Sequence, residues 1–142
     1  MKPINVVLDT NVLVSALRSK QGASYKLLSL IDNGDFILNI SVPLFLEYEA
    51  VVFRESLNLP LDKSDIEDIL NYIAQVSSKR DIFYLWRPCL KDPKDDLVLE
   101  VAVESRSDII VTYNKKDFVG IDKFGIETLT SKEFLEKRGL LP

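Results

Sequence analysis

Short apolar runs alternate along this chain with longer stretches in which apolar residues recur every three or four positions. The short runs have the length and β-branched content of strands, and the longer stretches have the periodicity of helices. Strands are predicted at residues 4–8, 36–40, 108–112 and 126–129. Helices are predicted at residues 12–17, 24–32, 43–55, 64–76, 95–104 and 131–137. Residues 81–85 fit either a further short strand or an extended connector.

Capping residues mark where several of these helices begin. Ser64, with Glu67 three residues later, predicts a capping box. Pro43 suits the first turn of its helix, and Ser131 is the predicted cap of the last one. These signals support the helix boundaries drawn from the apolar pattern.

Strands that alternate with helices from end to end predict a parallel sheet with helices on both faces. The stretch 95–104 is apolar nearly all round, so we expect a buried helix there. The 142 residues contain no repeat or linker that would divide them, and they fit one domain of common size. We therefore predict a single domain, 1–142, of the α/β class: a three-layer α/β/α sandwich around a mainly parallel sheet.

Composition limits the chemistry that is open to this domain. The chain has no histidine, which excludes a Ser-His-Asp triad, histidine-ligated zinc and a histidine base. Its one cysteine, Cys89, excludes an internal disulfide and a cysteine-based zinc cluster, and we expect a half-buried thiol without a role. Acid–base and charge chemistry must then come from carboxylates, lysines, tyrosines or a bound metal.

Charge and hydropathy bear on partners and location. A formal net charge of −4 is unusual for a protein that coats nucleic acid, but an enzyme that contacts a few phosphates needs only a local basic rim. No stretch approaches the roughly 20 apolar residues of a membrane span. The short apolar run at the N-terminus ends in an acid, which does not suit a secretory signal. We expect a cytoplasmic protein without a membrane segment.

Five polar residues are predicted to gather at one edge of the sheet. In such folds the helix N-termini lie at the carboxyl ends of the strands, where ligands bind. Asp9 ends the first strand, and Glu47 lies one turn into the helix after the second. Asp96 begins the buried helix, and Asn114 and Asp117 follow the next strand. Each acid alone also fits a structural role such as helix capping, and only their shared position indicates a functional site.

Carboxylates that converge in this way must take up protons or bind a cation. Two unit charges about 4 Å apart repel by roughly 4 kcal/mol at an effective dielectric constant near 20. The site offers only oxygen ligands of this kind, which favour Mg²⁺ or Mn²⁺. Such a cation lowers the pKa of a bound water and stabilises charge on a phosphoryl group, so hydrolysis is possible without histidine.

The same segments resemble the PIN-domain nucleases, in order and over nearly the whole chain. The resemblance lies in Val7-Leu8-Asp9-Thr10-Asn11, in Leu46-Glu47, in the helix that begins at Asp96, and in 112–118. The segment 92–96 is most similar to the branch described as toxins of bacterial toxin–antitoxin modules. The resemblance implies an α/β/α endoribonuclease that cleaves single-stranded RNA with Mg²⁺ or Mn²⁺, an antitoxin partner and a homodimer.

The resemblance also implies roles for individual residues. Asp9, Glu47 and Asp96 are expected to be the metal-binding and catalytic acids. The fourth group of the family follows the threonine by two residues or by five, so it is either Asn114 or Asp117. Thr112 and Asn11 are expected to lie behind these ligands and to orient them or the attacking water. Lys115 and Lys116 are expected to contact substrate phosphates.

Two other interpretations stay open. A phosphoryl-transfer hydrolase with Asp9 as nucleophile usually needs a second acid two residues later, where this chain has Asn11. A PIN-like interaction module without activity is kept open by Asn114, which replaces an acid. In that case Leu57, Leu59 and Leu61 are candidates for a partner surface, or else part of the core.

Overall fold

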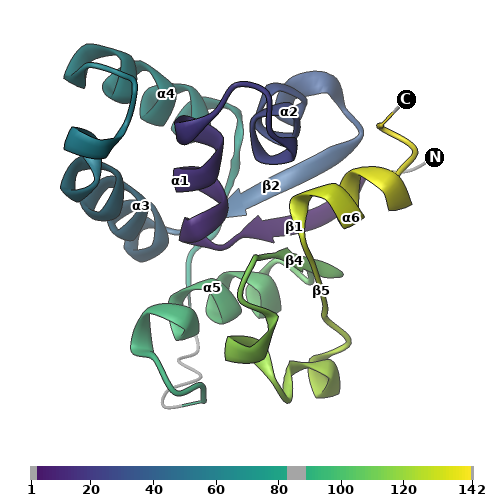
Figure 1. The fold of residues 1–142 in the computed structure, drawn as a ribbon. Helices are drawn as coiled ribbons and strands as arrows, with labels where there is room; N and C mark the ends of the chain where they lie inside the picture. Colours follow the sequence, from purple (N-terminus) through teal and green to yellow (C-terminus); the bar gives the residue numbers. More distant parts are fainter. Residues whose placement is uncertain (1–2, 83–88, 142) are drawn as a thin grey trace.

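In the described part of the chain, five strands form one parallel sheet in the order β3-β2-β1-β4-β5 (Figure 1). They are β1 (Ile4–Leu8), β2 (Phe36–Ile40), β3 (Ser78–Lys79), β4 (Ile109–Val111) and β5 (Glu127–Leu129). Every neighbouring pair runs parallel. The structure is a computed structural model and describes residues 3–82 and 89–141. Because β1 is central, Val6 and Val7 on its two faces are both fully buried.

Helices cover both faces of this sheet, which confirms the predicted α/β class. They are α1 (Thr10–Arg18), α2 (Ala23–Ser29), α3 (Val42–Arg54), α4 (Lys63–Val76), α5 (Pro93–Glu104) and α6 (Ser131–Lys137). Short 3-10 turns are η1 (Ile31–Asn33), η2 (Ser56–Asn58), η3 (Lys115–Phe118) and η4 (Ile121–Phe124). Helix α5 packs against β1, β2 and β4, with α1 and α2 on the other side of the strands (Figure 1). Among the described residues, no helix is long and apolar enough to cross a membrane.

Two predicted helix caps are wrong by one or two residues. Helix α4 is capped by Asp62, whose side chain accepts from the Asp65 amide at 2.8 Å in a reciprocal capping box. Aspartate caps as well as serine, so the earlier residue takes this position and Ser64 lies inside the helix. Helix α6 is capped by Thr130 rather than Ser131. The Ser131 hydroxyl is buried and lies 2.8 Å from the Ser24 hydroxyl instead.

The third strand lies at two residues for which the sequence predicted no strand. Strand β3 comprises only Ser78 and Lys79 and pairs with the end of β2. These two polar residues carry no apolar pattern, so their strand pairing depends on tertiary context. For residues 81–85 either a short strand or an extended connector was predicted: residues 81 and 82 are in no strand, and 83–85 fall outside the described residues.

Candidate active site

The pairing of β1 with β4 brings Asp9 next to Thr112 at the carboxyl edge of the sheet. Leu8 is in register with Val111, and the Asp9 amide donates to the Val111 carbonyl at 2.9 Å. The Thr112 hydroxyl donates to Asp9 Oδ2 at 2.8 Å, and the Thr10 amide donates to Asp9 Oδ1 at 2.8 Å. Asp9 therefore caps α1 and is also held in one orientation at the edge of the sheet.

The loop after β4 is held against the start of α1 by the same residues. The Asn114 amide donates to Thr112 Oγ1 at 2.9 Å, and the Tyr113 amide donates to Asn11 Oδ1 at 3.4 Å. The Asp117 amide donates to the Asn114 carbonyl at 3.0 Å, which closes the turn η3. Thr112 and Asn11 thus position the loop that carries Asn114 and Asp117.

Helix α3 contributes Glu47 from its second turn, just beyond a well-anchored N-terminus. Its N-cap is Ser41, whose hydroxyl accepts from the Leu44 amide at 3.2 Å. The Glu47 side chain is only 15% exposed, and its Oε1 lies 3.7 Å from Lys94 Nζ. Next to it, the buried Tyr48 hydroxyl donates to the Leu8 carbonyl at 2.5 Å, which ties α3 to the end of β1. Tyr48 had no signal in the sequence beyond its place beside Glu47.

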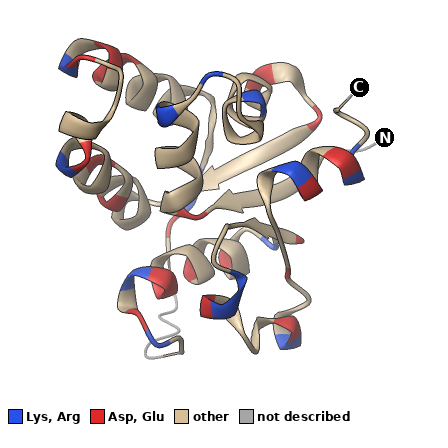
Figure 2. Ribbon diagram, viewed as in Figure 1, with Lys and Arg blue, Asp and Glu red and all other residues tan. Residues whose placement is uncertain are grey.

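These groups line a cavity of about 410 Å³ at the carboxyl edge of the sheet. Its acidic and amide side chains are Asp9, Asn11, Glu47, Glu55, Asp92, Asp95, Asn114 and Asp117. Its basic side chains are Arg18, Arg54 and Lys94, and Thr10, Val14 and Val51 complete the lining. Figure 2 shows acidic segments at the end of β1 and near the start of α5. Of the predicted site residues, Asp9, Asn11, Glu47, Asn114 and Asp117 meet in this cavity.

Asp96, predicted to be a site acid, does not line the cavity. It is 1% exposed, and its Oδ1 accepts from the Leu90 amide at 2.9 Å. Helix α5 starts at Pro93 with Asp92 as its N-cap, and consecutive helical residues point about 100° apart. Asp95 therefore faces the cavity while Asp96 points inward and holds the loop before the helix. The apolar pattern of α5 extends nearly all round, so it did not indicate which of the two acids faces the site.

Asp95 has the most strongly perturbed carboxyl group in the cavity. Its pKa is raised from 3.8 to about 7, first because burial disfavours the charged form. The charges of Asp9, Asp117, Asp92 and Asp96 raise it further, in that order. The cavity thus contains more negative charge than its own basic side chains neutralise.

The Asp9 carboxyl group is also perturbed. Burial raises its pKa, and the nearby charges of Asp117 and Asp92 add to that effect. The hydrogen bonds from Thr112 and Thr10 lower the pKa and so offset part of the burial penalty. Asp9 is therefore a buried acid whose charged form depends on two specific donors.

The donor set at this edge suits a hard cation. The carboxylate and amide oxygens of the cavity are the ligands that Mg²⁺ and Mn²⁺ take, and a bound cation would relieve the repulsion at Asp95. Among the described residues, no three acidic side chains stand close enough together to hold a metal ion as they are. The chemistry of the donors fits such an ion, while their spacing would have to tighten around it.

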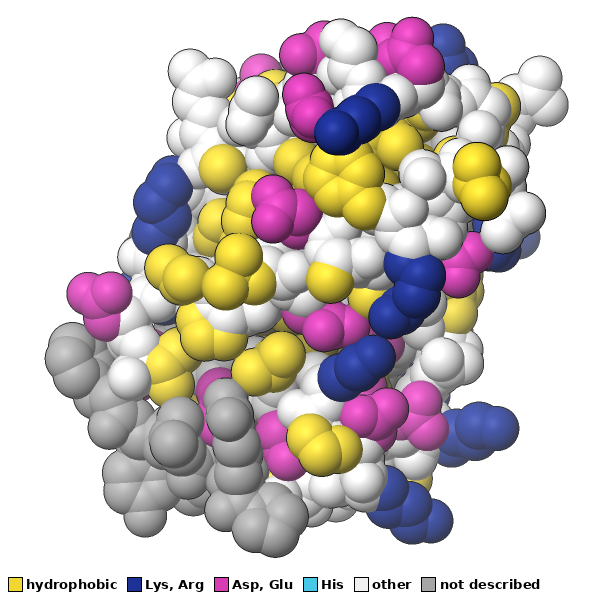
Figure 3. All heavy atoms as spheres, turned by 90° about the vertical axis from the view of Figure 1, so that its left-hand side faces the viewer, with side chains coloured by type: hydrophobic (Ala, Val, Ile, Leu, Met, Phe, Trp, Pro, Cys, Tyr) yellow, Lys and Arg dark blue, Asp and Glu magenta, His cyan; other side chains and the backbone are white. Residues whose placement is uncertain are grey.

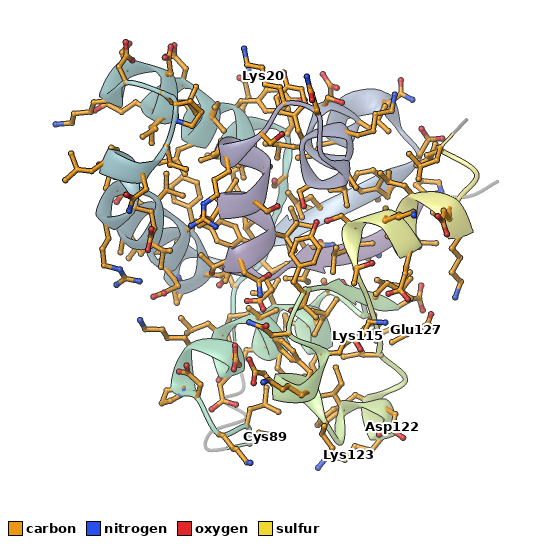
Figure 4. All side chains as sticks on the ribbon, in the orientation of Figure 1. Lys20, Cys89, Lys115, Asp122, Lys123 and Glu127 are labelled. Carbon is orange, nitrogen blue, oxygen red and sulfur yellow. The ribbon has the colours of Figure 1, made fainter. Side chains whose placement is uncertain are left out.

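The two predicted phosphate contacts, Lys115 and Lys116, do not line the cavity. Lys115 Nζ lies 2.6 Å from Glu133 Oε1 on α6, and Figure 4 shows Lys115 beside β5. This pair lowers the pKa of Glu133 to about 2, together with the Thr130 amide. Within the short turn η3 each residue points in a different direction, so Asp117 reaches the cavity and the two lysines do not.

Two further expectations, on Cys89 and on the leucines of 57–61, are tested by the exposure of these side chains. Cys89 is exposed at the outer end of its loop, so the expectation of a half-buried thiol is wrong (Figure 4). Leu57 is 97% exposed, whereas Leu59 is buried and Leu61 is partly buried against the core. Figure 3 views the α3 and α4 side of the molecule, where hydrophobic side chains are exposed among charged ones.

Comparison with known proteins gives the family. A family model described as PIN domain matches residues 5–116, most of the chain and all of the cavity lining except Asp117. The chain belongs to the PIN-domain family, which is a family of nucleases. A relative of this chain is the uncharacterized protein MJ1680 of Methanocaldococcus jannaschii, 28% identical over an alignment that covers 94% of this chain and 91% of the relative.

Proposed function

We propose that this protein is a divalent-metal-dependent endoribonuclease that hydrolyses phosphodiester bonds of single-stranded RNA at the cavity lined by Asp9 and Asp95. The observation that carries this proposal is the gathering of partly buried acids there: burial first, and then the charges of the neighbouring acids, raise the pKa of Asp95 to about 7. Acids held at such an electrostatic cost are typical of functional sites rather than of structural ones.

Asp9, Asp95, Asp117 and the Asn114 amide oxygen are the proposed ligands, with Glu47 as a further ligand or as the group that orients the attacking water. When bound, a divalent cation supplies charge for the phosphate oxygens and lowers the pKa of water. Thr112 and Thr10 keep Asp9 oriented through their hydrogen bonds. Asp96 is proposed as a positioning residue, because it holds the Leu90 amide ahead of the helix that carries Asp95.

The biological role follows from the resemblance rather than from the geometry. This proposal includes single-stranded RNA as the substrate and a cytoplasmic location. It also includes a role as the toxin of a toxin–antitoxin pair, with an antitoxin partner and a homodimeric state. The similarity of the segment 92–96 to the toxin branch supports them.

A PIN-like interaction module is the second candidate. One observation favours it: within the described residues, no three acids are already spaced to hold a metal. A phosphoryl-transfer enzyme with Asp9 as nucleophile is less well supported. Asp9 is only 7% exposed, and both of its oxygens accept hydrogen bonds.

The test is cleavage of a mixed single-stranded RNA pool with Mg²⁺ or Mn²⁺ by the native protein and by Asp95→Asn. We expect metal-dependent cutting by the native protein and a loss of at least about tenfold in the variant. Equal cutting by both would show that Asp95 is not in the site. No cutting with either metal, and no rise in melting temperature when metal is added, would favour the interaction module.

A further inference from the structure

The cavity has two ends of opposite charge. At one end Asp9, Asp95 and Asp117 have no basic partner among the described residues. At the other end two arginines, Arg18 and Arg54, line the cavity with a single acid, Glu55. Lys94 and Glu47 lie between them as a pair, 3.7 Å apart. The acidic end suits a cation, and the arginine end has a net positive charge that suits an anion.

The two arginines come from the last turns of neighbouring helices. Arg18 ends α1 and Arg54 ends α3, and these helices pack against one another. The Arg18 side chain is 58% exposed, and its guanidinium lies 3.8 Å from Glu55 Oε2. An exposed pair at that separation contributes little to stability and does not prevent the guanidinium from binding another anion. Part of the role of both arginines is to complement the helix C-termini.

The lining between the two ends is partly apolar. Val14 of α1 and Val51 of α3 face the cavity between the acids and the arginines. Asp9 caps α1 and Arg18 ends it, so the helix rise of 1.5 Å per residue separates them by about 13 Å. At a rise of about 3.4 Å per stacked nucleotide, this distance corresponds to about four nucleotides.

We infer that Arg18 and Arg54 bind the backbone phosphates of a single-stranded RNA about four nucleotides away from the bond that is cut. The inference rests on the proposed function, because it takes the acidic end as the place of cleavage. Guanidinium groups bind phosphate through paired donors, and the apolar segment accommodates a base or ribose between the two ends. The cavity, and not the lysines of the loop after β4, is then the path of the RNA strand.

The test is binding of a fluorescein-labelled 12-nucleotide RNA by fluorescence anisotropy, in EDTA so that no cleavage occurs. The double variant Arg18→Gln/Arg54→Gln is compared with Lys26→Gln/Lys132→Gln, which removes the same charge from exposed sites on α2 and α6 that do not line the cavity. The conservative double variant Arg18→Lys/Arg54→Lys, and melting curves of all proteins, control for folding.

We expect the arginine variant to bind at least about fivefold more weakly than the native protein, with the slope of log K against log salt shallower by about 1.4 for two lost contacts. The lysine control should stay within about twofold, and Arg18→Lys/Arg54→Lys should recover most of the affinity. Glu55→Gln should bind more tightly than the native protein, because it removes the competing acid.

Two results would overturn the inference. One is equal weakening in the arginine and lysine variants, and the other is no RNA binding by the native protein. Cleavage by the native protein with Mn²⁺, measured in parallel, distinguishes a failure of the inferred RNA path from a failure of the proposed nuclease function. Cutting without arginine-dependent binding would retain the nuclease and reject this path. Arginine-dependent binding without cutting would retain the phosphate contacts and reject the nuclease.

Discussion

Replacing Asp95 by asparagine removes one negative charge from the cavity while it keeps the size of the side chain. The folded-state pKa of Asp95 is raised from 3.8 to about 7, so the folded protein holds this proton more tightly than the unfolded chain does. The stability from this group is fully present below about pH 4 and is lost as pH rises towards 7. The asparagine variant has no such loss, and its advantage over the native protein grows across that interval.

The size of this stability difference depends on how much of the pH range below the Asp95 pKa the measurement covers. Between pH 5 and pH 7, two pKa units correspond to about 2.7 kcal/mol at 1.36 kcal/mol per unit. Asp95 is only partly buried, and solvent screening reduces this figure to roughly 1 kcal/mol. For a domain of this size that is a difference of about 3 °C in melting temperature.

The assay is denaturant unfolding in metal-free buffer at pH 5 and pH 8 for the native protein and Asp95→Asn, with the exposed Asp108→Asn as the control. We expect the gain in stability of Asp95→Asn to be larger at pH 8 than at pH 5 by roughly 1 kcal/mol, and the control to show no such difference. An equal gain at both pH values would refute the claim that Asp95 is held among repelling acids.

Two further substitutions test how the site is held together. Asp96→Ala leaves the Leu90 amide without its acceptor, so the free energy of unfolding should fall by about 1–3 kcal/mol. Asp96→Asn keeps an acceptor oxygen, so its free energy of unfolding should fall less. Urea titration distinguishes the two variants, and equal losses would contradict the role of Asp96 as the acceptor of the Leu90 amide. Thr112→Val removes the donor to Asp9 and the acceptor of the Asn114 amide. We therefore expect the free energy of unfolding to fall by about 1–2 kcal/mol and cleavage to become slower. Thr112→Ser should restore both properties, and a fully active Thr112→Val would show that Asp9 needs no such donor.

The sequence predicted the fold better than the orientation of side chains within it. Strands β1 and β2 match their predicted limits to the residue, because each is a mostly apolar run that ends at a polar residue, Asp9 or Ser41. Strand β3 escaped prediction because Ser78 and Lys79 have no apolar pattern of their own. Its place in the sheet comes from pairing with β2 alone.

In the candidate site too, the positions of the elements could be predicted better than the orientations of the side chains. That Asp9, Glu47 and Asp117 share one edge follows from the topology, which the alternation of strands and helices predicts. The choice between Asp95 and Asp96 depends on the rotation of one helix, and a helix that is apolar all round gives no sign of it. The partner of Lys115 is likewise settled by the position of α6, which no local pattern encodes.

The hydrogen bond between Asp9 and Thr112 joins residues 103 positions apart. During translation at about 5–20 residues per second, Asp9 is made roughly 5–20 s before Thr112. A growing chain that has only its first hundred residues lacks β4, the Thr112 hydroxyl and the loop that carries Asp117. The acids of the cavity therefore come together only after Thr112 and Asp117 have been made, and a growing chain that ends before them does not yet contain the assembled site.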